Sequence, residues 1–138
     1  FARVERLRSQ TKALGLEDRV AFFVNVPFPE LQRLLGASVA GLHSMKDEHF
    51  GISVVEYMAA GAIPIAHNSA GPRMDIVTKE TGYLVETAEE CAAAMAAVLG
   101  MSESDRVAMA ALGRRRAELF TQERFQQGFL GALLSGIS

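Results

Sequence analysis

Short apolar runs alternate with stretches of helical periodicity through the first 85 residues of this 138-residue chain. The apolar runs occupy residues 20–25, 39–43, 62–66 and 82–85, and each has the length of a buried strand. Strands that are separated by helices pair in parallel, because each helix supplies the crossover that a parallel pair needs. Right-handed crossovers then place helices on both faces of the sheet. The sequence therefore predicts an α/β fold built on one parallel sheet.

Glycine and proline mark where the helices begin and end. Helices are expected at residues 2–15, 29–36, 53–60, 88–99, 103–120 and 122–135. Gly15, Gly61 and Gly100 are expected to end three of them, and Pro29 fits the first turn of another. The last helix is predicted to be separate and amphipathic, with one apolar side formed by Phe125, Phe129, Leu130, Leu133 and Leu134.

Two polar loops, residues 44–52 and 67–72, each follow a predicted strand. The carboxyl ends of parallel strands meet at one edge of a sheet, and ligands of such sheets bind outside that edge. We therefore expect both loops to border one crevice.

Charge and composition exclude several classes of function. The net charge is −2, which gives no reason to expect a nucleic-acid partner. Cys91 is the single cysteine, so a disulfide within the chain is impossible, and its alanine-rich surroundings predict a packed thiol. The basic run at residues 114–116 is expected to be a solvated helix face rather than a contact for anionic lipid.

No apolar run reaches the ~18 residues that a membrane-spanning helix needs, and no signal peptide opens the chain. These features predict a soluble domain of a reducing compartment. The chain has no initiator methionine, and Phe1 leads directly into a helical pattern. We therefore expect a piece of a longer protein.

Two carboxylates, Glu48 and Glu56, stand eight positions apart across a phenylalanine–glycine turn that opens an apolar helix. The first amides of a helix have no partner within the helix, and the helix dipole adds positive charge there, so this turn is suited to an anion. Gly51 would let a phosphate approach the backbone, or it would serve a tight turn alone. Ser53 and Glu56 also match a capping box, which gives Glu56 a purely structural alternative. The same pattern recurs at residues 87–90 and 102–105.

The motif resembles the E-x7-E motif of the family 4 retaining glycosyltransferases, which have the GT-B architecture. Matching positions are Glu48, Phe50, Gly51, Glu56, residues 58–61, residues 63–66 and Gly71. The resemblance implies that Glu48 is the catalytic residue that binds hydroxyls of the donor sugar. It implies that the amides at Phe50, Gly51 and Ile52 face the sugar and the diphosphate, and that Glu56 binds the ribose.

The loops around residues 43–45, 66–69 and 71–77 are most similar to one branch of this family. Its members are the endoplasmic-reticulum α-1,2-mannosyltransferases, which use GDP-mannose to extend the dolichol-linked oligosaccharide of N-glycosylation on the cytosolic face. Two positions depart from the broad family, because Ala70 stands where a second glycine is usual and Asp75 where a glutamate is usual.

The resemblance implies that residues 1–138 form one domain, the partial nucleotide-sugar-binding, Rossmann-like C-terminal half of a GT-B enzyme without its first strands. Val26 is a possible neighbour of the base. GDP-mannose is then a substrate, no metal is needed, and the lipid-linked oligosaccharide is bound mostly by a missing N-terminal half. The Arg and Lys that neutralise the diphosphate in the family have no match here, so the chain alone is expected to be inactive.

Alternatives remain open at this point. One is a non-catalytic interaction module, in which Glu48 faces solvent and Glu56 is a helix cap. Another is a family 4 enzyme with a different donor such as UDP-glucose. A dinucleotide oxidoreductase is disfavoured, because no G-x-G-x-x-G follows a strand. His43, His49 and His67 lie in separate segments without the spacing of metal ligands.

Overall fold

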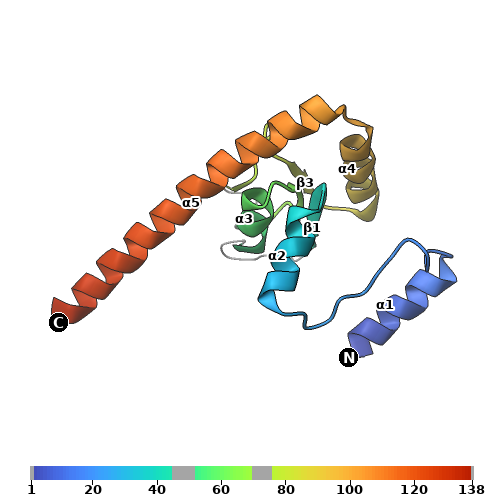
Figure 1. Cartoon of the computed structure of the whole chain (residues 1–138), viewed down its shortest axis with the longest axis horizontal. Coiled ribbons are helices and arrows are strands. Elements are labelled where there is room, and N and C mark those ends of the chain that lie inside the picture. The colour runs from blue at the N-terminus through green and yellow to red at the C-terminus, as the bar shows by residue number, and fades with distance from the viewer. Residues whose placement is uncertain (1, 45–51, 70–75, 138) are drawn as a thin grey trace. The chain divides into compact units, whose positions relative to one another are not determined.

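The structure of the chain, a computed structural model, contains a parallel sheet with the strand order β1-β2-β3 (Figure 1). It describes residues 2–44, 52–69 and 76–137, and the side chains of these residues except those of Ile52 and residues 121–137. The strands are β1 (Ala40–His43), β2 (Ile63–His67) and β3 (Tyr83–Val85). Both neighbouring pairs are parallel, with Leu42 opposite Ile65 and Ala66 opposite Leu84. The predicted parallel α/β sheet is confirmed, with each of these strands within one residue of its expected bounds.

The chain divides into two compact units, Phe1–Leu31 and Gln32–Ser138, which are described separately. The first contains helix α1 (Ala2–Ala13). Gly15 follows it with a φ of 69°, and the amide of Leu16 donates to the carbonyl of Thr11 at 3.0 Å. This bond pattern is a Schellman motif, in which a left-handed glycine satisfies the last carbonyls of the helix. The predicted stop at Gly15 is confirmed.

The strand predicted at residues 20–25 is wrong, since the segment has no regular structure. A strand needs a neighbouring strand for its backbone hydrogen bonds, and no described residue of this chain provides that ladder. The apolar side chains therefore stay in contact with solvent, as the 54% exposure of Phe23 shows. Asn25 has a φ of 53°, which turns the backbone out of the extended conformation. Helix α2 (Phe28–Gly36) follows, with Pro29 in its first turn as predicted.

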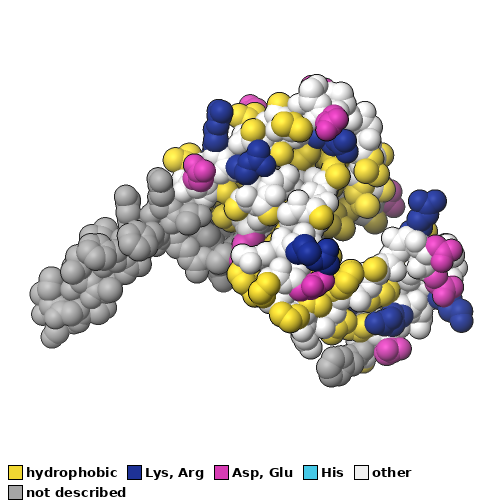
Figure 2. All heavy atoms as spheres, viewed as in Figure 1, with side chains coloured by type: hydrophobic (Ala, Val, Ile, Leu, Met, Phe, Trp, Pro, Cys, Tyr) yellow, Lys and Arg dark blue, Asp and Glu magenta, His cyan; other side chains and the backbone are white. Residues whose placement is uncertain are grey.

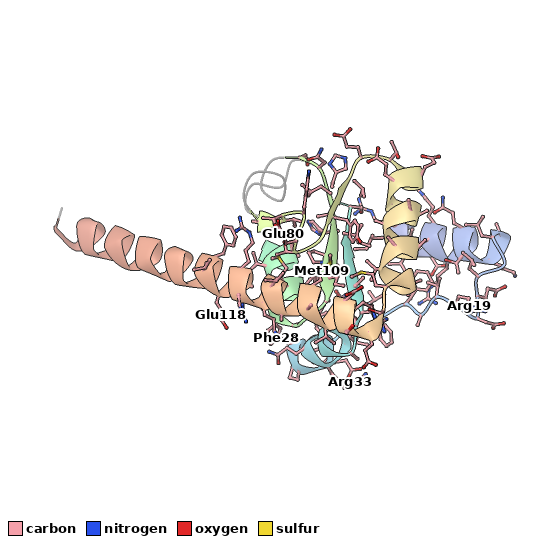
Figure 3. All side chains as sticks on the ribbon, turned by 90° about the horizontal axis from the view of Figure 1, so that it is seen from above. Arg19, Phe28, Arg33, Glu80, Met109 and Glu118 are labelled. Carbon is pink, nitrogen blue, oxygen red and sulfur yellow. The ribbon has the colours of Figure 1, made fainter. Side chains whose placement is uncertain are left out.

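In the second unit the sheet lies between α3 (Ile52–Ala59) and α4 (Ala88–Gly100), as Figure 3 shows. Strand β2 is the centre of this arrangement, because successive side chains of a strand point to opposite faces. Ile63 and Ile65 pack with Ala94 and Val98 of α4. On the other face, Ala66 belongs to a second cluster formed by Val54, Val55, Met58, Ile76, Val77 and Ala117. The prediction of helices on both faces is confirmed.

Helix α3 ends at a second left-handed glycine. Gly61 has a φ of 87°, and the amide of Ala62 donates to the carbonyl of Tyr57 at 2.9 Å, which is again a Schellman motif. At the start of α4, the hydroxyl of Thr87 accepts from the amide of Glu90 at 3.1 Å. The predicted stop at Gly61 and the predicted cap at Thr87 are both confirmed.

Helix α5 (Glu103–Ile137) continues for 35 residues, so the prediction of two separate helices at 103–120 and 122–135 is wrong. The expected break fell at Thr121, but a β-branched residue only weakens a helix slightly, and no proline stands there to end it. The hydroxyl of Ser102 caps the start of α5 by accepting from the amide of Asp105 at 3.1 Å. Among the described residues, no helix has both the length and the apolar character needed to cross a membrane.

The basic run at residues 114–116 occupies α5, over which Figure 2 shows basic side chains. Its members differ in environment. Nε of Arg116 donates to the carbonyl of Ile76 at 2.9 Å, and the guanidinium lies 5.3 Å from the centre of the Phe120 ring. Arg114 and Arg115 are exposed. The expectation of a solvated helix face therefore agrees with the exposure of Arg114 and Arg115 and is wrong for Arg116, which ties α5 to the segment before β3. Exposure alone does not test the alternative of a contact for anionic lipid.

We expect Gly41→Ala to destabilise the fold by about 1–3 kcal/mol, because a Cβ at this position would stand 2.6 Å from Cγ of Tyr57. Urea denaturation followed by circular dichroism measures the change in the free energy of unfolding. Gly100→Ala is the matched control, since a Cβ there meets nothing within 4 Å. Equal unfolding midpoints for the two variants would contradict the packing of β1 against α3.

We expect Arg116→Ala to lower the free energy of unfolding by about 1.5–3 kcal/mol, because a charged donor is lost and the carbonyl of Ile76 loses its partner. Arg115→Ala removes the same charge from an exposed neighbour and is expected to change stability by less than about 0.5 kcal/mol. Thermal unfolding of both variants tests the difference. A loss that is no larger for Arg116→Ala would show that its hydrogen bond is energetically unimportant.

Candidate functional site

The three strands end at one edge of the sheet. Strand β1 ends at His43, β2 at His67 and β3 at Val85, and the parallel pairing places these ends side by side. Ser44 opens the loop after β1, and Asn68 opens the loop after β2. Where the structure describes these loops, both leave from the carboxyl edge as predicted. Residues 45–51 and 70–75, which include Glu48, Phe50, Gly51, Ala70, Gly71 and Asp75, lie outside the described residues.

The amino end of α3 is described from Ile52, the first residue of the helix. Its backbone amide is one of the four that have no acceptor within the helix, and the dipole makes this end favourable for an anion. The buried side of α3, formed by Val54, Val55 and Met58, fixes the helix on the sheet. The amino end is thus held at the carboxyl edge by packing, while the roles predicted for Phe50, Gly51 and Ile52 stay predictions.

Glu56 lies on the exposed side of α3. The helix begins at Ile52, so Ser53 lies in its first turn rather than at the position that precedes it. Thr87 and Ser102 do act as caps, because their hydroxyls accept from the amides three residues later. By contrast, within the described parts of the chain no hydrogen bond joins the Glu56 carboxylate to Ser53. Glu56 is thus exposed and does not cap the helix through Ser53, and its ribose-binding role stays a prediction.

A cavity of about 270 Å³ opens at the same edge, on the side of α4. It is lined by Leu42, His43, Ser44, Ile65, His67, Val85, Glu86, Thr87, Ala88 and Cys91. The aliphatic side chains come from the strands, and the polar ones come from the strand ends and from the start of α4. Such a mixture can hold an organic group against an apolar wall while polar atoms fix its orientation.

Hydrogen bonds order the polar rim of this carboxyl-edge cavity. Nδ2 of Asn68 donates to Oε1 of Glu86 at 3.0 Å, and the amide of Glu86 donates to Oε2 of Glu90 at 3.2 Å. Nδ1 of His67 lies 3.0 Å from Oγ of Ser69. The loops after β2 and β3 are thereby tied together. The sequence analysis did not single out Glu86. It directly follows a predicted strand, so the rule that ligands bind at the carboxyl ends of parallel strands could have identified it.

Two of the three histidines line the same cavity. His43 and His67 line the carboxyl-edge cavity, whereas His49 lies outside the described residues. The ring of His43 meets that of Tyr57 edge-on, with 6.4 Å between centroids. Within the described ranges, no group of three or more His, Cys, Asp or Glu side chains could hold a metal ion. Cys91 is half-buried beside the cavity, as expected of a packed thiol.

Val26 belongs to the first unit, where its side chain is half-buried. Its possible contact with the base of the donor stays a prediction.

Comparison with known proteins gives relatives over nearly the whole chain. The family model "Glycosyl transferases group 1" matches residues 2–116. A human protein named GDP-Man:Man(3)GlcNAc(2)-PP-Dol alpha-1,2-mannosyltransferase is 42% identical over 135 residues, which are 95% of this chain and 27% of the relative. The protein of the same name from Dictyostelium discoideum is 43% identical over 129 residues, 93% of this chain and 25% of the relative. The chain thus spans about a quarter of the length of these curated relatives.

Solved structures agree on the fold. Sucrose-phosphate synthase from Thermosynechococcus elongatus is similar with a TM-score of 0.81 and 25% identity, over 99% of this chain and 35% of that one. The C-terminal domain of a group 1 glycosyl transferase from Francisella tularensis has a TM-score of 0.62 and 23% identity, over 86% of this chain and 62% of that one. The fold is the Rossmann-like C-terminal half of the GT-B architecture, and the chain belongs to the group 1 glycosyltransferase family.

Proposed function

We propose that this chain is the donor-binding part of a retaining α-1,2-mannosyltransferase, which transfers mannose from GDP-mannose to a dolichol-linked oligosaccharide. The observation that carries the proposal is the 42% identity over 95% of the chain to a human protein whose name states this donor, acceptor and linkage. The activity would belong to a longer protein, because the chain spans about a quarter of that relative.

The geometry at the carboxyl edge supports a nucleotide-sugar site. The amino end of α3 offers amides and a dipole to the diphosphate, and the exposed Glu56 stands one turn further along the same helix. A carboxylate suits a ribose because its two oxygens can accept from neighbouring hydroxyls. In this proposal Glu56 binds the ribose and Glu48 binds the mannose, while the amides at Phe50, Gly51 and Ile52 face the sugar and the diphosphate.

The proposed reaction breaks the bond between the anomeric carbon and the diphosphate, so negative charge develops on GDP as it leaves. Oriented amides at the start of α3 would stabilise that charge without reorganisation, and cations from upstream of this chain would add to them. The proposal requires no metal.

The acceptor implies the setting of the longer protein. A dolichol-linked oligosaccharide is anchored in a membrane, and the proposed location is the cytosolic face of the endoplasmic reticulum, where N-glycosylation begins. This chain would hold the donor there, and an N-terminal half would hold most of the acceptor. Nucleic acid has no place in this scheme, in keeping with the net charge of −2.

We expect Glu56→Ala in the longer protein to lower kcat/KM by about 10- to 100-fold, because hydrogen bonds from the ribose to a charged acceptor are lost. Its free energy of unfolding should change by less than about 0.5 kcal/mol, since Glu56 is exposed. Ser102→Ala is the control, because it removes a true helix cap at the start of α5 and should cost about 1 kcal/mol of stability with unchanged turnover. A Glu56→Ala enzyme with normal turnover would favour the non-catalytic alternative.

Donor identity is tested by competition in the same longer protein. We expect GDP to inhibit mannose transfer and UDP-glucose to compete poorly, because a site that hydrogen-bonds one base leaves polar groups unpaired with another. Isothermal titration with GDP, GDP-mannose and UDP-glucose gives the three affinities directly. Preference for UDP-glucose would replace the proposed donor within the same family. The 138-residue chain alone is expected to transfer no mannose.

A further inference from the structure

A second cavity of about 280 Å³ opens at the opposite, amino edge of the sheet, between the strands and α5. It is lined by Val39, Gly61, Ile63, Glu103, Arg106, Val107, Ala110 and Arg114. The five residues from α5 recur at spacings of three and four, so they form one face of the helix. This amino-edge cavity shares no lining residue with the carboxyl-edge cavity, and the proposed donor site does not use it.

Two guanidinium groups dominate the charge of this cavity. Arg106 is half-buried and Arg114 is exposed, and Glu103 contributes a single carboxylate. Among the residues that the structure describes, neither arginine forms an ion pair or a side-chain hydrogen bond, although an acid lines the same cavity. Both therefore keep all of their donors for a ligand. Arg116, the third member of the same stretch of α5, is excluded because it donates to Ile76.

The glycine that ends α3 makes room for one of these arginines. A Cβ on Gly61 would stand 2.6 Å from Nη1 of Arg114, so any other residue would displace the guanidinium from this position. A cation here also suits the carboxyl end of α3, where the helix dipole is negative. The absence of a side chain at Gly61 thus leaves space for the guanidinium of Arg114, which lines the cavity.

The remaining lining is aliphatic. Ile63 forms a buried floor, whereas Val39 and Val107 are 42% and 57% exposed. Exposed aliphatic groups next to two unpaired arginines fit a ligand that carries both an anionic group and an apolar part. Arginine matches phosphate oxygens through its planar fork of donors, and its stem packs along apolar surface.

We propose that the amino-edge cavity binds a phosphate group through Arg106 and Arg114, with Val39 and Val107 in contact with the apolar part of an anionic amphiphile. The ligand class is a phosphate ester, whose source is either the head group of a membrane lipid or a free phosphate compound. The site is independent of the donor site, because the two lie at opposite edges of the sheet.

The first experiment compares binding of the full chain to vesicles of phosphatidylcholine with and without phosphatidylserine by sedimentation. The second follows a titration of the chain with inorganic phosphate by NMR of the arginine side chains. We expect binding that requires phosphatidylserine, and we expect Arg106→Gln and Arg114→Gln each to weaken it about fivefold. Phosphate binding without vesicle binding would support the site and assign it a soluble ligand.

Arg115→Gln is the matched control, because it removes the same charge from an exposed residue that does not line the cavity. It should change binding by less than twofold, whereas Glu103→Gln should strengthen binding by removing the opposing carboxylate. Arg114 borders the end of α3, so a loss of binding in Arg114→Gln could come from a disturbed fold. Arg106→Gln provides a second, separate test of the same cavity. The proposal is overturned if Arg115→Gln weakens binding as much as Arg114→Gln, or if neither vesicles nor phosphate bind.

Discussion

The parallel pairing of β2 with both of its neighbours is the constraint on which the rest of the second unit depends. Residues 63–66 of this strand are buried, so helices must cover both faces of the sheet. Because the three strands share one direction, their carboxyl ends meet at one edge and their amino ends at the other. The carboxyl edge then collects the loops after β1, β2 and β3, and the amino edge collects the end of α3 and the start of α5. Two chemically different cavities follow from one pairing pattern.

Local chemistry made several helix ends and the strands of the sheet predictable from sequence. A helix often ends with a residue in the left-handed conformation, which glycine adopts without strain. Gly15 and Gly61 both adopt that conformation. Apolar runs of strand length gave β1, β2 and β3 nearly to the residue. The capping pattern was informative at Thr87 and Ser102, where the hydroxyl accepts the expected bond. At Ser53 the same pattern gives no such bond among the described residues, because α3 starts at Ile52, two residues before the start that a cap at Ser53 requires.

The failures concern features that a local pattern does not contain. Residues 20–25 have the composition of a strand, but pairing depends on a partner elsewhere, and no described residue provides one. The break predicted at Thr121 is absent, because nothing at that position stops helical hydrogen bonding. The candidate site was also predictable only in part. Its position at the carboxyl edge of the sheet follows from the direction of the strands, whereas the contacts of Glu48 and Gly51 depend on a loop that lies outside the described residues. Arg116 shows a further limit, because its environment was set by α5 packing near Ile76 and not by its basic neighbours.

Helix α3 connects this packing to the proposed chemistry. An isolated helix of eight residues is unstable in water, so its stability must come from tertiary contacts. Those contacts are the burial of Val54 and Met58, the packing of Tyr57 over Gly41 and the Schellman turn at Gly61. Glu56 takes part in none of these contacts, and its side chain is exposed. An anion bound at the amino end of α3, as proposed, would meet backbone amides that the packing of the helix already orients, and such preorganisation is what allows electrostatic groups to stabilise a leaving anion.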